Sequence, residues 1–92
     1  MANANEIEIE VEGRDMKWRI VMANVDGEGE KEVARILIDE NFKEEADQLR
    51  ATVHDTPFGF VAATRTATFG PYRYRESAME IAETTSYENP DA

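Results

Sequence analysis

The chain has 92 residues, with 20 Asp or Glu against 10 Lys or Arg, so its formal net charge is −10 at pH 7. This length supports one small core and no deep substrate cavity, and we expect a single domain over residues 1–92. The acidic surplus disfavours direct binding to nucleic acids or anionic membranes, because both repel a negative surface. Basic proteins are the natural partners of such a chain.

The first expected element is a β-hairpin over residues 6–22. Apolar and charged residues alternate through 6–12 and again through 16–22, which is the period of half-buried strands. A two-residue type II′ turn at Gly13-Arg14 then fixes the register. The resulting pairs are Ile9 with Trp18 on the core face, and Glu8 with Arg19 and Glu10 with Lys17 on the other face.

Residues 32–38 are compatible with a third strand or with a helix, and we favour the strand. Asn41, followed three residues later by Glu44, has the spacing of a helix-capping box. Apolar residues then recur at helical intervals from Phe42 to Val53, which predicts a helix over about 42–54 that ends before Pro57.

The rest of the chain predicts one strand and one helix. Residues 58–69 are rich in aromatic and β-branched residues and predict a single long or bent strand, which ends at Gly70-Pro71. Helical spacing of Ala78, Met79 and Ala82 predicts a helix over about 75–85. Residues 1–5 and 87–92 are expected to be flexible tails. The expected fold is therefore α+β, with a small antiparallel sheet and both helices on one of its faces.

Catalytic and metal-binding patterns are incomplete. The sequence has no cysteine, which excludes disulfide bonds and thiolate ligands. His54 precedes Asp55, but no nucleophile motif accompanies them. Residues 26–30 resemble half of a calcium loop, yet Lys31 occupies the position of the required glycine. We therefore expect neither an enzyme nor a bound metal or cofactor.

No apolar run approaches the ~18 residues of a membrane span, and the first residues lack the basic and apolar segments of a secretion signal. We accordingly expect a cytoplasmic protein, in the host cytoplasm if the chain is viral, with no membrane contact.

Two groups of residues are candidates for binding a partner protein. Acidic residues far from compensating arginines could attract a basic surface, and tyrosines interleaved with Arg73 and Arg75 could anchor an interface. The candidates are Glu28, Glu30, Glu32, Glu40, Glu44, Glu45, Asp47, Tyr72 and Tyr74.

These features favour a small acidic protein-binding module that inhibits or regulates a basic, nucleic-acid-binding partner. Carboxylates spaced along a strand or helix could imitate a phosphate backbone, as small anti-defence proteins of phages and mobile elements do. The alternative is a structural or assembly domain, homodimeric through a free sheet edge or the aromatic stretch, whose acidic surface serves solubility or a high-salt cytoplasm.

Overall fold

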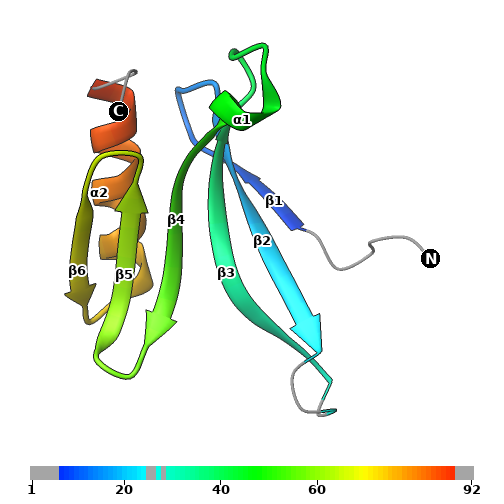
Figure 1. Ribbon diagram of the computed structural model, residues 1–92, viewed down its shortest axis with the longest axis vertical. Helices are drawn as coiled ribbons and strands as arrows, with labels where there is room; N and C mark the ends of the chain where they lie inside the picture. The colour runs from blue at the N-terminus through cyan, green and yellow to red at the C-terminus, as the bar shows by residue number, and fades with distance from the viewer. Residues whose placement is uncertain (1–6, 25–26, 28, 89–92) are drawn as a thin grey trace.

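The computed structural model describes residues 7–24, 27 and 29–88. Within these residues the fold is α+β, with one antiparallel sheet whose six strands follow the order of the chain (Figure 1). The strands are β1 (Ile7–Glu10), β2 (Met16–Asn24), β3 (Glu30–Asp39), β4 (Leu49–Thr56), β5 (Gly59–Thr64) and β6 (Thr68–Tyr72). A short helix, α1 (Glu45–Gln48), precedes β4, and a longer helix, α2 (Arg75–Glu88), follows β6.

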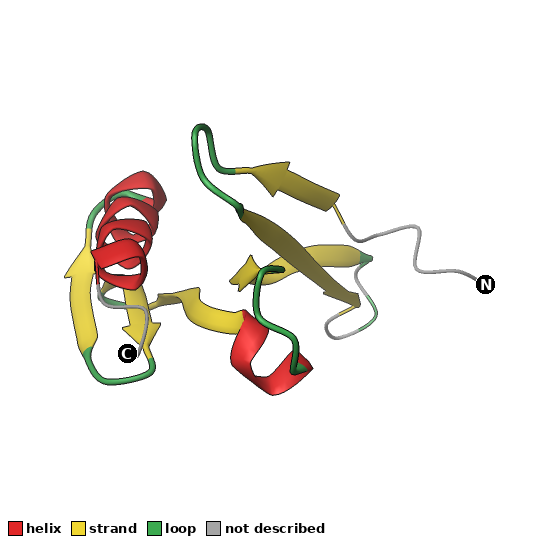
Figure 2. Ribbon diagram, turned by 90° about the horizontal axis from the view of Figure 1, so that it is seen from above, coloured by secondary structure: helices red, strands yellow, loops and turns green. Residues whose placement is uncertain are grey.

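The sheet is strongly curved, and α2 lies against the half of it that β4, β5 and β6 form (Figure 2). The helix presents Ala78 and Ala82 to the strands, and both side chains are fully buried. Because alanine is small, the helix axis can approach the sheet closely. The core that results contains Met16, Trp18, Leu37, Ala51, Val53, Ala62, Ala78 and Ala82.

The N-terminal hairpin has the predicted register. Ile9 lies opposite Trp18, and Glu8 and Glu10 lie opposite Arg19 and Lys17. Trp18 is 1% exposed, as expected for the core face. The type II′ turn was a wrong prediction, because the loop is longer. Its hydrogen bonds run from the Val11 N–H to the Met16 carbonyl and from the Arg14 N–H to the Val11 carbonyl, and Gly13 has a φ of 76° within this loop.

The open choice for residues 32–38 is resolved in favour of a strand. β3 covers Glu30–Asp39 and pairs with β2 on one side and with β4 on the other. The segment therefore lies inside the sheet, and Leu37 near its C-terminal end is completely buried.

The helix predicted over about 42–54 is wrong. Only Glu45–Gln48 is helical, and Leu49–Thr56 forms β4, because Val53 pairs with Arg35 of β3 and with Ala62 of β5. β-branched residues in this segment favour a strand once such neighbours exist. Asn41 does not cap a helix: its backbone N–H donates to Asp39 and its side-chain amide to another carboxylate.

The single strand predicted over 58–69 is instead two strands, separated by a turn that the Thr64 N–H closes onto the Ala67 carbonyl at 2.8 Å. Gly70-Pro71 does not end the second strand but lies inside β6, with a cis peptide bond. Proline is tolerated there because β6 is an edge strand. A Cβ atom on Gly70 would lie 2.7 Å from the Phe60 carbonyl oxygen, so only glycine permits this approach of β6 to β5.

The predicted C-terminal helix is present and longer than expected. α2 runs to Glu88, so Tyr87 and Glu88 belong to a helix and not to the expected tail over 87–92. The remaining tail residues, 1–5 and 89–92, lie outside the described part of the chain. The two helices do not share one face as predicted, because α1 has four residues and adjoins the start of β4 while α2 alone covers the strands.

Candidate functional site

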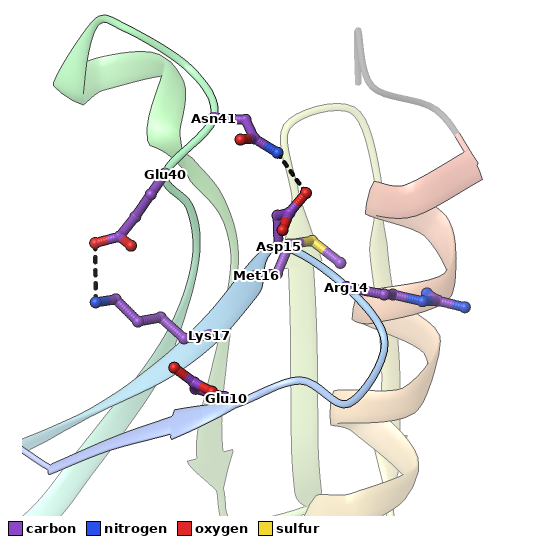
Figure 3. A pocket seen from close by; sticks show the side chains of 7 residues that line it. All are labelled: Glu10, Arg14, Asp15, Met16, Lys17, Glu40 and Asn41. Atoms are coloured by element: carbon purple, nitrogen blue, oxygen red, sulfur yellow. Dashed lines mark hydrogen bonds and ion pairs between the residues drawn. The ribbon is translucent and has the colours of Figure 1, made fainter.

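A polar hollow of about 270 Å³ lies where the β1–β2 loop meets the β3–α1 loop (Figure 3). The two loops come together because antiparallel strands return the chain to the same end of the sheet. The side-chain amide of Asn41 donates to the Asp15 carboxylate at 2.9 Å and joins them. The lining residues are Glu10, Arg14, Asp15, Met16, Lys17, Glu40 and Asn41.

Lys17 is the centre of an ion-pair network beside this hollow. Its Nζ atom lies 2.9 Å from a carboxylate oxygen of Glu8 and 2.9 Å from one of Glu40, and Arg19 is 3.1 Å from Glu8. Hydrogen bonds from Lys17 and then Arg19 hold the pKa of Glu8 below its ordinary value. Hydrogen bonds to Glu40 and then Glu8 raise the pKa of Lys17. Both groups therefore stay charged at neutral pH, and the ion pairs fix the positions of the Glu8 and Glu40 carboxylates beside the hollow.

A second hollow of about 180 Å³ continues from the first toward the C-terminal end of α2. The guanidinium of Arg14 stacks on the Tyr87 ring at 4.1 Å, which ties the β1–β2 loop to the helix. The buried Ser86 hydroxyl has no hydrogen-bond partner within the described structure. His54, the sole histidine of the sequence, pairs with Val61 of β5 and does not line this hollow.

The predicted acidic candidates do not form one surface. Glu30 and Glu32 lie at the start of β3, whereas Glu40, Glu44 and Glu45 follow its end. Glu32 and Glu40, the nearest members of the two groups, are eight positions apart along β3, which corresponds to about 26 Å at ~3.3 Å per residue. Glu28 lies outside the described residues. A single flat contact would therefore engage one group and not both.

Several of these carboxylates also have basic partners, so the expectation that they lie far from compensating arginines is wrong for them. Glu32 is half-buried and lies 2.9 Å from Arg35 and 3.2 Å from Arg75. Asp47 lies 3.5 Å from Arg65. The negative charges of Glu32 and Asp47 are therefore partly neutralised by neighbouring arginines and contribute less to an acidic surface than the sequence pattern predicts.

Glu44 and Glu45 remain exposed at the α1 end of the sheet, and no ion pair to either appears in the part of the chain that is described. Glu10 and Asp15 lie at the same end and were not predicted as site residues. The sequence offers little signal for Asp15, because only the fold brings it to Asn41.

The aromatic candidates have different environments. Tyr72 packs against the core and pairs with Phe60, so its ring is only partly accessible. Tyr74 is 59% exposed, and the Arg73 guanidinium lies 5.9 Å from its ring centre. Phe58 is 85% exposed in the turn between β4 and β5. The exposed aromatic residues in the described part of the chain are therefore Phe58, Tyr74 and Tyr87, and Tyr72 is not among them.

Across residues 7–24, 27 and 29–88, no group of three or more His, Asp or Glu side chains is arranged to hold a metal ion. No helix in these ranges has the length and apolar character needed to span a membrane. No protein-family model matches the sequence, and neither a curated protein nor a solved structure matches it.

Proposed function

We propose that this chain is a small acidic protein-binding module that inhibits or regulates a basic, nucleic-acid-binding partner. The observation that carries the proposal is the surplus of carboxylates at the end of the sheet where the β1–β2 and β3–α1 loops meet. Glu10, Glu12, Glu44 and Glu45 are exposed there, and no cationic partner for them is found in the described structure. We call these four residues the acidic end.

The charge distribution supports recognition of a basic surface by electrostatic steering. The formal charge of −10 accelerates encounter with a positive partner and repels nucleic acid from the same surface. A groove that normally holds phosphates would be blocked by carboxylates bound in their place. The mode of action is therefore competition with nucleic acid, of the kind that a phage or mobile-element protein could use against host defence.

The test compares two charge-reversal variants with the same formal change. Glu12, Glu44 and Glu45 are replaced by Lys in the first, which removes most of the acidic end. The second is the control, with Lys at Asp55, Glu76 and Glu80, which are exposed elsewhere and have no ion-pair partner within the described residues. Each tagged protein is used to capture partners from the native host at low salt and at ~0.5 M NaCl, where screening is strong.

We expect the wild type and the control to capture the same basic protein at low salt, and the first variant to lose it. Added wild-type chain should release nucleic acid from the captured partner. If both variants lose capture of the partner equally, net charge alone explains the binding and the acidic end has no specific role. If the first variant captures the partner as well as the wild type does, the proposal is refuted.

A further inference from the structure

One edge of the sheet is open. β1 is the first strand in the sheet order and pairs on one side only, with β2, among the residues that the structure describes. It lies at the margin farthest from α2 (Figure 1). The outer N–H and C=O groups of such a strand are available to pair with another chain.

The two faces of β1 have contrasting chemistry. Ile7 and Ile9 lie on the face that buries Trp18 and Ile20 on β2, yet they are 53% and 42% exposed. The helix that covers this face packs on β4, β5 and β6 and leaves β1 uncovered. Ile7 and Ile9 therefore continue the apolar face of the sheet to its edge, where no described element packs over them.

The other face of β1 is acidic. Glu8 is held in place by Lys17 and Arg19, with 40% of its side chain still exposed. Glu10 is exposed and has no ion pair with any described residue. An incoming strand would thus meet an apolar surface on one face and a negative surface on the other.

A second copy of this chain does not fit that edge. In a paired sheet, opposed residues share a face, so any register that joins isoleucine to isoleucine also places glutamate opposite glutamate. Like charges directly opposed destabilise a strand pair. The net charge of −10 on each copy adds a long-range repulsion.

We propose that β1 accepts an extended segment of the basic partner, in which apolar and basic residues alternate, as an added strand of the sheet. The apolar side chains cover Ile7 and Ile9, and Lys or Arg side chains face Glu8 and Glu10. Main-chain hydrogen bonds supply affinity, and the alternation supplies specificity. The inference rests on the proposed function for the basic character of the partner, and it adds the mode of binding.

The test uses blocked synthetic peptides of eight residues in place of the natural partner. One peptide alternates valine and arginine, a second has the same composition in two blocks, and a third replaces arginine by glutamate. Binding is measured by the amide NMR shifts of residues 7–10 in the intact chain. We expect the alternating basic peptide to bind about tenfold more tightly than the block peptide, since only it satisfies both faces at once.

Two further measurements separate strand addition from general attraction. Glu10→Lys should weaken binding of the alternating peptide by roughly tenfold, whereas Glu80→Lys, which makes the same charge change on the exposed side of α2, should weaken it less than about threefold. Methylation of the peptide amides that would face β1 should abolish binding, because it removes the main-chain donors without altering charge.

Equal binding of the alternating and block peptides, or an equal effect of the two lysine variants, would overturn the inference. Self-association of the chain through residues 7–10 at ~0.5 M NaCl would also overturn it, in favour of a second copy as the occupant. These outcomes are distinct from failure of the proposed function, which is decided by capture of the natural partner with the Glu12, Glu44 and Glu45 variant.

Discussion

Replacement of Trp18 by Phe tests how the helix is attached to the sheet. The indole Nε1–H of Trp18 donates to the Glu83 carboxylate of α2 at 2.6 Å, and the indole itself is 1% exposed. Hydrogen bonds to charged groups contribute about 1.5–3 kcal/mol. The smaller phenyl ring also leaves a void, which costs roughly 1 kcal/mol in a core that cannot fully collapse.

We therefore expect Trp18→Phe to lower the free energy of unfolding by about 3 kcal/mol, and Trp18→Ala by about 3–5 kcal/mol. A domain of this size has a total stability of roughly 5–14 kcal/mol, so either loss is a large fraction of it. The assay is urea unfolding followed by far-ultraviolet circular dichroism, because the sequence has a single tryptophan and the variants have no fluorescent reporter of that kind.

A double-mutant cycle with Glu83→Ala isolates the hydrogen bond from the change of volume. If the bond anchors α2, Trp18→Phe should be much less costly in the Glu83→Ala background, with a coupling energy above about 1 kcal/mol. Additive losses, within ~0.5 kcal/mol, would mean that Glu83 does not hold the indole and that packing alone positions the helix.

Three other expectations follow from backbone geometry and charge. Ala at Gly59 or Gly70 should cost more than about 2 kcal/mol in urea unfolding, because each Cβ would meet a backbone oxygen at 2.5 or 2.7 Å, whereas Gly13→Ala, with open space around it, should cost only the ~1–2 kcal/mol of a left-handed residue. The pKa of Glu8 is lowered and that of Lys17 is raised, so their pairing stabilises the fold fully between pH 4.5 and 10.5. This stabilisation is lost as pH falls through the folded pKa of Glu8 or rises through that of Lys17. The difference in the free energy of unfolding between wild type and Glu8→Gln should therefore be constant near neutral pH and vanish in acid. The melting temperature in scanning calorimetry should rise between low salt and ~0.5 M NaCl, since salt screens the repulsion of a −10 charge, and a flat response would show that local pairing already cancels it.

The strand pairing of the hairpin could be predicted, though its turn could not, because the residues of 6–12 and all of 16–22 except Val21 follow one alternating pattern. The segment after Asn41 could not, because Ala46, Leu49 and Val53 fit a helical period as well as a strand. The segment forms a strand because β3 and β5 pair with it on either side, and a short stretch of sequence does not include these neighbours.

The candidate site was predicted only in part, for the same reason. Glu40, Glu44 and Glu45 stand out in the sequence as acidic residues, and all three lie near the junction of the β1–β2 and β3–α1 loops. Asp15 joins them through Asn41, which is 26 residues away along the chain. The pairing of Glu32 with Arg75 likewise depends on where α2 begins relative to β3, and the sequence pattern does not carry that information.

The chain-order arrangement of the strands has a consequence for how the protein folds. Every strand pairs with the one before it, so each step in assembling the sheet closes only a short loop and loses little chain entropy. Helix α2 follows all six strands, and the cover over β4, β5 and β6 cannot form before it docks. During synthesis all six strands therefore leave the ribosome before α2 is available, so one apolar face of the sheet is bare until α2 docks, and the new chain is prone to aggregate during that interval.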